Sequence, residues 1–314
     1  MSKKEFDTVL FAFIVCCLIA AIIGLTNAYI NYLESSDTGF FYNNWLVYPV
    51  NNQAVYFSVY INLAIVFIVQ QMQTGLLQSK KRLILGIIAI LFLLAFNFML
   101  ASRLSLVIIF LMGFVYLLYW IITERRYKVG LGLLGSVLIL IFIMAIAMPK
   151  TVKRFKSIAN TSYSFENMRA ENHFNKEISP ENWNGLTLRL AIWTCALEVV
   201  EKHPIVGVGT GDYSKELEGA YESKGFQYAI EKDYGIHNQY LYFLFITGIV
   251  GLIIFLASIM VPIYWAFAEK NWLYILFILL IACAFLTENI LNKYTGIVFF
   301  SLMSGLLLFR EKKS

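Results

Sequence analysis

The sequence has little charge, little proline and very few histidines and cysteines. Only 14% of its 314 residues are Asp, Glu, Lys or Arg, and it has 5 prolines, 4 cysteines and 3 histidines. So little charge excludes an ordinary water-soluble domain, because long apolar runs would have to be exposed to water. Of the cysteines, only Cys195 lies outside the apolar runs, which indicates neither a disulfide framework nor a metal site.

Long apolar runs make up most of the chain instead. Hydrophobic residues account for 59% of it and aromatic residues for 16%, and the mean hydropathy is +0.68. A helix needs about 20 apolar residues to cross a bilayer core. The runs therefore predict an all-α polytopic membrane protein with one large helical extracytoplasmic loop. The eight predicted spans are Val9–Tyr29, Ala54–Met72, Leu83–Leu100, Leu104–Ile122, Val129–Met148, Gln239–Phe267, Trp272–Leu286 and Gly296–Phe309.

Basic residues near the ends of these spans favour one side of the membrane. If the chain alternates between the two sides, most of them share a side, which the positive-inside rule makes cytoplasmic. Both termini are then cytoplasmic, and the net charge of +5 follows from this bias, so we expect no nucleic-acid partner. The residues concerned are Lys3, Lys4, Lys80, Lys81, Arg82, Arg125, Arg126, Lys128, Lys270, Arg310, Lys312 and Lys313.

One long polar segment interrupts the apolar runs and divides the chain into three predicted parts. These are helices one to five in residues 1–149, an extracytoplasmic loop in residues 150–235, and helices six to eight in residues 236–314. A loop of this length inside a compact protein is usually functional. Apolar spacing, proline and glycine predict helices within it over Phe165–Lys176, Leu186–Glu201 and Asp212–Lys224.

Three residues are candidates for chemistry, and each has an ordinary structural alternative. Arg103, at the outer end of a span, can reach the lipid headgroups. Arg189, on the apolar-rich helix of the loop, can be a surface residue or pair with Glu201 or another acid. His237, where the sixth span begins, can be a satisfied polar contact. The predicted topology places all three on the outer face, so we treat them as one candidate site.

These side chains suit a diphosphate and a hydroxyl acceptor. Two guanidinium groups, Arg103 and Arg189, can neutralise and orient diphosphate oxygens without a metal. The positive end of a helix dipole and a nearby arginine favour the neutral imidazole of His237, which can act as a base. Glu288 and Asn289, at the outer end of the seventh predicted span, can hydrogen-bond into the site, with a helix cap or an interhelical contact as the alternative. Asn238 is a further candidate supporting residue. The site predicts attack by a hydroxyl on a group that leaves as a lipid-linked phosphate.

A glycine-rich segment, Gly207-Val208-Gly209-Thr210-Gly211-Asp212, follows the central helix of the loop. It lacks the GK[ST] of a P-loop and has no surrounding strand and helix of that fold. We interpret it as a tight bend, with backbone contact to a substrate phosphate as the alternative.

Short motifs follow one another in a definite order along the chain. They are Ser102-Arg103, R-x-x-x-W from Arg189 to Trp193, HP-x-x-G-x-G-x-G-D from His203 to Asp212, HNQYL from His237 to Leu241, and G-x-x-G at Gly248 and Gly251. Together they resemble the O-antigen ligase and O-antigen polymerase superfamily, over roughly Tyr48 to Phe309. That family commonly has about ten to twelve spans, whereas eight are predicted here.

The resemblance implies a metal-independent, inverting glycosyltransferase of the GT-C type, without a cofactor, on the periplasmic face of the inner membrane of a Gram-negative cell. The implied donor is an undecaprenyl-diphosphate-linked glycan, held by Arg103 and Arg189, and His237 activates the acceptor hydroxyl. The acceptor is lipid A–core for a ligase, the first prediction, and another lipid-linked repeat unit for a polymerase. A transporter or flippase of lipid-linked sugars is the alternative from another class, although inverted repeats and mid-membrane charges, which such proteins commonly have, are not evident.

Overall fold

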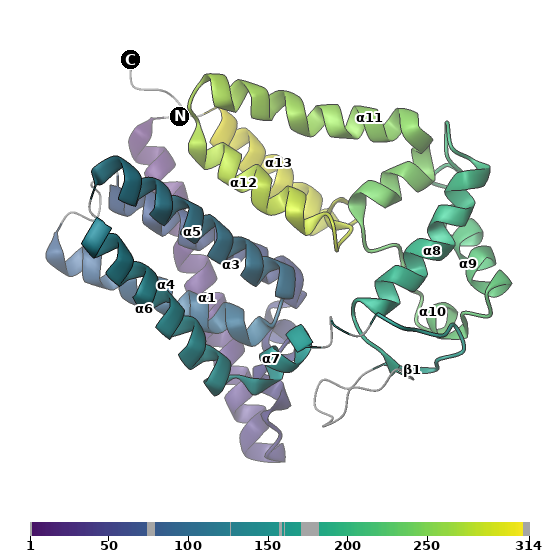
Figure 1. Cartoon of the computed structure of the whole chain (residues 1–314), viewed down its shortest axis with the longest axis horizontal. Helices are drawn as coiled ribbons and strands as arrows, with labels where there is room; N and C mark the ends of the chain where they lie inside the picture. Colours follow the sequence, from purple (N-terminus) through teal and green to yellow (C-terminus); the bar gives the residue numbers. More distant parts are fainter. Residues whose placement is uncertain are drawn as a thin grey trace. The chain divides into compact units, whose positions relative to one another are not determined.

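The computed structural model describes residues 2–73, 79–125, 127–156, 159, 161–170 and 182–309. It is 80% helical and divides into two compact units, Met1–Lys153 with Phe309–Ser314, and Arg154–Leu308. Figure 1 shows the helices in chain order. The predicted all-α polytopic class is confirmed in this coarse form, whereas the division into three parts at residues 149 and 235 stays a prediction.

Among the described residues, six helices are long and apolar enough to cross a membrane. The last two predicted spans form the shorter apolar helices α12 (Trp272–Ala284) and α13 (Tyr294–Leu308), of 13 and 15 residues. Since about 20 residues are needed for a full crossing, the total of eight spans stays a prediction. The six long helices are α1 (Lys3–Ser35), α3 (Ala54–Gln73), α4 (Lys80–Leu100), α5 (Arg103–Glu124), α6 (Tyr127–Ala147) and α11 (Gln239–Ala268).

Helix α3 is the central helix of the first unit and packs against α1, α4 and α5. Its buried Asn62 donates through Nδ2 to Ser105 Oγ at 2.8 Å, and its Oδ1 accepts from Asn97 Nδ2 at 2.7 Å. Helices in lipid gain little from the hydrophobic effect when they associate, so hydrogen bonds between side chains help to hold them together. This network joins α3, α4 and α5.

The turn between α4 and α5 carries Arg103. Ala101 ends α4 in the left-handed conformation, with φ 53°, and Arg103 is the first residue of α5. Thr151 of α7 (Pro149–Lys156) donates through Oγ1 to Phe98 O at 2.8 Å and braces the end of α4. Between α1 and α3 lie the short helices η1 (Thr38–Phe41), α2 (Asn44–Val47) and η2 (Tyr48–Val50).

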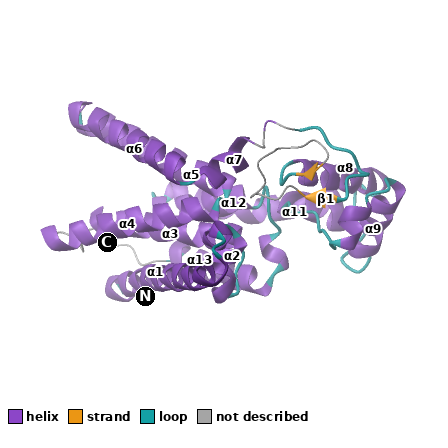
Figure 2. Cartoon of the chain, turned by 90° about the horizontal axis from the view of Figure 1, so that it is seen from below, coloured by secondary structure: helices purple, strands orange, loops and turns teal. Residues whose placement is uncertain are grey.

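The second unit contains a two-stranded parallel pair, which the sequence did not predict. β1 (Arg169–Ala170) pairs with β2 (Asn182–Trp183), and Figure 2 shows both strands beside α8. Next come α8 (Thr187–Lys202), α9 (Tyr213–Ser223) and α10 (Gln227–Glu231), then α11, α12, η4 (Ile290–Asn292) and α13. Helix α8 packs against α9 and α11, α11 against α12, and α12 against α13.

Two of the three helices predicted in the loop are confirmed by α8 and α9. The helix predicted over Phe165–Lys176 is wrong where the structure describes it, because residues 165–170 form a turn and the strand β1. The strand's pairing with residues 182–183, on the other side of Pro180, overrides the local helical pattern. Residues 171–176 lie outside the described part of the chain.

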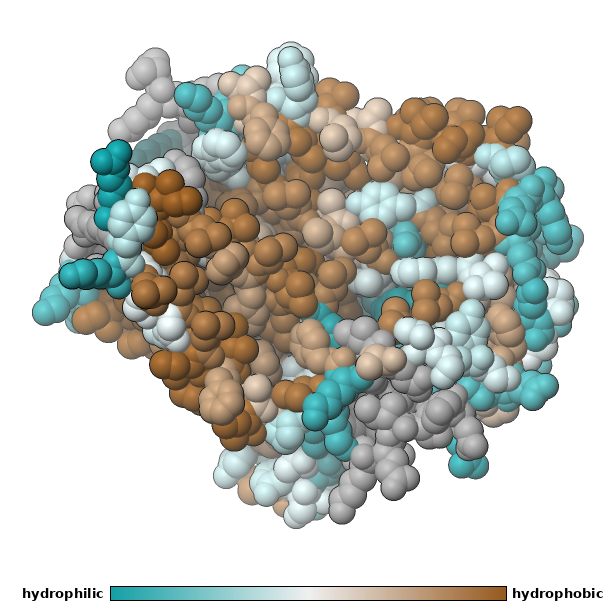
Figure 3. All heavy atoms as spheres, in the orientation of Figure 1, coloured by the Kyte–Doolittle hydropathy of each residue, from teal (hydrophilic) through white to brown (hydrophobic). Residues whose placement is uncertain are grey.

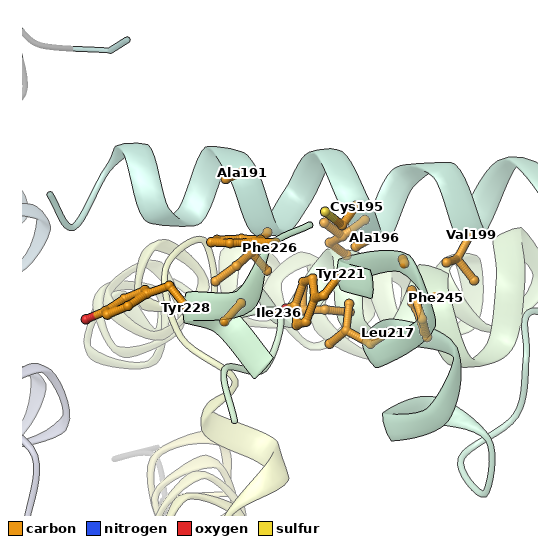
Figure 4. Close-up of a cluster of buried hydrophobic side chains, with 14 of the residues drawn as sticks. Ala191, Cys195, Ala196, Val199, Leu217, Tyr221, Phe226, Tyr228, Ile236 and Phe245 are labelled. Atoms are coloured by element: carbon orange, nitrogen blue, oxygen red, sulfur yellow. The ribbon is translucent and has the colours of Figure 1, made fainter. Parts of the chain in front are cut away.

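The core of this unit lies under one face of α8 (Figure 4). Ala191, Cys195 and Val199, spaced four residues apart, are buried on that face. They face aromatic and aliphatic side chains of the following segments, among them Leu217, Tyr221, Phe226, Tyr228, Ile236 and Phe245. Burial raises the pKa of the Cys195 thiol to about 12, so this cysteine serves as a small apolar side chain.

Helix α11 is interrupted at Gly248, where the sequence predicted one continuous span. Gly248 has φ 61° and ψ −165°, which separates Gln239–Thr247 from Ile249–Ala268, and Figure 1 shows the bend. A residue with positive φ ends the helical ladder, and glycine adopts this conformation at the lowest cost. The longer segment, Ile249–Ala268, has 20 residues and alone spans about 30 Å.

Candidate active site

Glu288 joins two of the predicted site residues within the second unit. Its Oε1 accepts from Arg189 Nη2 at 2.8 Å, and its Oε2 lies 3.2 Å from His237 Nδ1. The glutamate side chain is 7% exposed, against 22% for the arginine and 34% for the histidine. A buried carboxylate thus lies between two nitrogen groups that both reach the surface.

The protonation state of Glu288 follows from these neighbours. Burial by itself raises the pKa of a carboxyl group, because the charged form loses its hydration. The hydrogen bond with His237 and the positive charge of Arg189 outweigh this effect and hold the pKa of Glu288 below its ordinary value. Glu288 is therefore ionised at neutral pH and accepts hydrogen bonds from both partners.

All three nitrogen atoms of the Arg189 side chain donate hydrogen bonds. Nε donates to Thr287 O at 3.2 Å and Nη1 to Gly185 O at 2.7 Å, in addition to the Nη2 bond to Glu288. These bonds use three of the five N–H donors of an arginine. Its acidic partner is thus Glu288 and not Glu201, and two N–H groups remain for a ligand.

His237 lies immediately before α11 and not inside it, which corrects the prediction that it begins the helix. The N-cap is Asn238, whose side chain accepts from Leu241 N at 3.0 Å, and α11 begins at Gln239. Asparagine is a preferred N-cap because its oxygen satisfies a free amide of the first turn. His237 itself has φ 50°, a conformation that a residue other than glycine keeps only when its surroundings hold it.

Two side chains hold the peptide groups just before His237. Tyr213 Oη accepts from Ile236 N at 3.2 Å, and Trp193 Nε1 donates to Ile236 O at 2.9 Å. Ile236 is fully buried, and burial raises the pKa of Tyr213 to about 12, so its phenol stays neutral. The backbone entering His237 is fixed on both sides of Ile236.

The R-x-x-x-W motif has a structural explanation in this arrangement. Arg189 and Trp193 lie four residues apart, so they project from the same face of α8. One side chain reaches Glu288 and the other reaches the residue before His237. Trp193 and Tyr213 are positioning residues that were not predicted from the sequence; for Trp193 the four-residue spacing from Arg189 was the available signal.

The predicted site residues belong to different units. Arg189, His237 and Glu288 meet in the second unit, with Asn238 beside them as the α11 cap, while Arg103 is a half-buried residue of the first unit. Among the described residues, no group of three or more His, Cys, Asp or Glu side chains is placed to hold a metal ion. The roles assigned to these residues, and that of Arg103 above all, stay predictions.

Comparison with known proteins gives the family. No curated protein sequence matches the chain. A family model described as O-antigen ligase matches residues 87–256, which include Arg103, Arg189 and His237 and end before Glu288. Because this match covers more than half of the 314 residues, the chain belongs to the O-antigen ligase family of membrane glycan-transfer enzymes.

Proposed function

We propose that this protein transfers a glycan from undecaprenyl diphosphate to a hydroxyl of lipid A–core, with inversion at the anomeric carbon and without a metal. Membership of the O-antigen ligase family supports glycan transfer. The observation that carries the mechanism is the Arg189–Glu288–His237 constellation, because it supplies an oriented base beside a cation. It lies in the second unit, where the apolar helices α11 and α12 meet the polar segments of the loop.

His237 is the proposed general base. Since Glu288 is an ionised acceptor, Nδ1 of the imidazole carries the proton that it shares with Oε2. The other nitrogen, Nε2, then has a free lone pair for the acceptor hydroxyl. Glu288 fixes the ring orientation and stabilises the imidazolium that forms, which is the role of the carboxylate in histidine-dependent catalysis.

The proposed step is a single displacement. The proton of the acceptor hydroxyl passes to His237 Nε2 while the acceptor oxygen forms a bond to the anomeric carbon. The bond between that carbon and the diphosphate oxygen breaks on the opposite face, and undecaprenyl diphosphate leaves with the electron pair. Attack opposite the leaving group inverts the configuration.

The leaving diphosphate needs positive charge. Arg189 presents its two remaining N–H groups, but its charge is already shared with Glu288. A diphosphate diester carries about two negative charges at neutral pH, so a second cation is required to balance it. We assign that role to Arg103, whose motif Ser102-Arg103 lies within the family match.

A repeat-unit polymerase is the second candidate, because the same base and cations serve either acceptor. Transport of lipid-linked sugars requires no general base and leaves the His237–Glu288 pair unexplained. The acceptor is distinguished by offering purified enzyme the undecaprenyl-diphosphate glycan together with lipid A–core or with a second lipid-linked unit. Ligation gives only the first product and polymerisation only the second.

The assigned base is tested by His237→Ala. We expect transfer to fall by about 10²- to 10⁴-fold, the usual contribution of a general base, while binding of the donor is retained. His203→Ala is the matched control, since His203 is an exposed histidine of the same unit. A His237→Ala protein that transfers glycan at the wild-type rate would overturn the assignment.

A further inference from the structure

The segment Pro204–Gly209, here called the glycine loop, is inserted into the break of α11. In an unbroken helix, Ile249 N would bond to Phe245 O and Val250 N to Ile246 O. In the structure Ile249 N donates to Pro204 O at 2.9 Å and Val250 N to Ile205 O at 3.4 Å. The loop therefore takes over two amide groups at the break, those of Ile249 and Val250.

The carbonyl groups released by the break are satisfied in the same way. Phe245 O accepts from Val208 N at 3.0 Å, and Ile246 O accepts from Gly209 N at 2.9 Å. Broken helices occur at membrane depth only where protein or water satisfies the released backbone groups. The glycine loop satisfies two amide and two carbonyl groups at the break with four hydrogen bonds.

Two glycines make this close approach between backbones feasible. A Cβ on Gly207 would lie 2.5 Å from Ile246 C, and one on Gly248 would overlap Ile205 C and O. Both residues also have positive φ, 67° and 61°. The glycines of two separate motifs thus fit against each other's chain, which gives them a structural role independent of any phosphate.

At its tip the glycine loop presents two large apolar side chains. Ile205 is 63% exposed and Val206 is 72% exposed. Beside them begins the longer segment of α11, which also exposes apolar residues: Ile249, Val250, Ile253 and Ile254, at 45%, 49%, 58% and 65%. Figure 3 shows hydrophobic side chains along α11 as far as its end beside α8. The loop tip and α11 form one continuous apolar surface.

We propose that Ile205 and Val206 are inserted into the acyl chains of the bilayer, at the surface on the side of the large loop, and act as a membrane wedge. We assign lipid as the partner of these side chains because their apolar surface continues from α11, whose longer segment has the length of a full crossing, about 30 Å. Ile249 begins that segment and is bonded to the glycine loop, so the wedge lies where the hydrocarbon core ends.

The wedge fixes the depth of α8 in relation to the membrane. α8 ends at Lys202, and only its C-cap His203 separates it from the glycine loop, so the helix that carries Arg189 and Trp193 is tied to the bilayer surface at one end. Since Arg189 lies on α8 and Glu288 contacts both Arg189 and His237, the wedge ties this site to the membrane surface, where the diphosphate of a lipid-linked donor lies.

The wedge is tested by placing a fluorophore at its tip. Val206→Cys in a chain without its four native cysteines is labelled with an environment-sensitive dye and reconstituted in phosphatidylcholine nanodiscs. The controls are Ile253→Cys, exposed on α11, and Glu218→Cys, exposed on the polar helix α9. We expect acyl-chain nitroxide lipid to quench the Val206 dye as it quenches Ile253, and soluble iodide to quench only the Glu218 dye.

Either contrary result overturns the proposal. Quenching of the Val206 dye by iodide would place the tip in water, and quenching by neither reagent would place it against protein, such as a second copy of the chain. If the cysteine-free chain does not fold, Val206→Cys and Glu218→Cys are made in the wild-type chain. Their labelling rates with a charged maleimide are then measured on the proteolytic peptide that contains the introduced cysteine, which separates it from the four native ones. Val206→Cys is expected to react far more slowly than Glu218→Cys. No arm measures glycan transfer, so the wedge and the proposed function fail or succeed separately.

Discussion

Replacing Glu288 by glutamine is the sharpest perturbation of the site, because it changes the charge and one hydrogen-bonding atom but hardly the volume. Both partners of Glu288, Arg189 Nη2 and His237 Nδ1, approach it as donors. Glutamine has one acceptor oxygen and one donor nitrogen, so one partner must face an N–H group. The permanently charged arginine keeps the oxygen, and the amide nitrogen faces His237.

This exchange reverses the histidine tautomer. With an N–H group opposite it, Nδ1 must act as the acceptor, and the proton moves to Nε2. Nε2 then has no lone pair for the acceptor hydroxyl, so we expect Glu288→Gln to lower kcat by about 10²- to 10⁴-fold, as loss of the base does. Donor binding is expected to persist, because Arg189 is retained.

The cost in stability is worked from the same contacts. A hydrogen bond to a charged group contributes about 1.5–3 kcal/mol. Arg189 is 22% exposed and keeps its bonds to Gly185 O and Thr287 O, which places the loss near the lower end, about 2 kcal/mol. The folded variant is therefore available for kinetic measurement.

The assay is single-turnover transfer by purified protein in nanodiscs, with donor binding and the thermal midpoint measured on the same samples. Glu218→Gln on α9 is the control for removal of an exposed carboxylate. A folded Glu288→Gln protein with the wild-type transfer rate would refute the tautomer argument. Equal losses of donor binding and transfer would instead show that Glu288 acts only through Arg189.

Three further outcomes follow from the structure. The pKa of Glu288 is lowered in the folded state, so its ionised form contributes stability above its ordinary pKa of 4.5, and this stability is lost as pH falls through the folded value. The difference in thermal midpoint between the wild type and Glu288→Gln should therefore vanish under strongly acidic conditions. A difference that stays constant with pH would contradict this. Trp193→Phe removes the donor to Ile236 O and should lower kcat about tenfold, the equivalent of about 1.4 kcal/mol, with little change in the KM for the donor. The control is Trp272→Phe, at an exposed tryptophan, and parallel changes in kcat and KM would argue against a positioning role for Trp193. Gly207→Ala places a side chain at positive φ, which costs about 1–2 kcal/mol, and against the α11 backbone, whereas the Cβ of Gly211→Ala meets nothing within 4 Å. The thermal midpoint of purified Gly207→Ala should therefore be lower than that of Gly211→Ala. Equal midpoints would show that the glycine loop is not locked into α11.

The long apolar helices could be predicted because their physical requirement is local. A segment that crosses lipid must satisfy its own backbone and be apolar over about 20 residues, and both properties are visible in a run such as Ala54–Met72. Helix α8 could be predicted for a similar reason, since its apolar residues repeat at helical spacing and Pro204 follows its end. The β1–β2 pair could not, because Arg169 and Asn182 pair across an intervening segment that no local pattern connects.

The break in α11 shows where hydropathy stops being informative. The run from Gln239 to Phe267 is apolar on both sides of Gly248, so no window average marks the interruption. The interruption depends on the glycine loop, some forty residues earlier, where the amides of Val208 and Gly209 replace the helical partners of Phe245 and Ile246 and Gly207 permits the close approach. The sequence showed two glycine motifs, but only the fold shows that they fit against each other.

The candidate site divides along the same line between local and distant information. Arg189 and His237 could be named from residue type and predicted topology, and Glu288 as a supporting residue, but the bonds that join them cross about a hundred and about fifty positions of the chain. That distance matters for the mechanism. The sequence-based prediction explains the neutral imidazole of His237 by a helix dipole and a nearby arginine, whereas in the structure His237 precedes the Asn238 cap and faces a buried carboxylate. The proposed base is therefore created by orientation: Glu288 accepts the hydrogen bond of the Nδ1–H group, Trp193 and Tyr213 fix the backbone that carries the ring, and Nε2 remains for the acceptor.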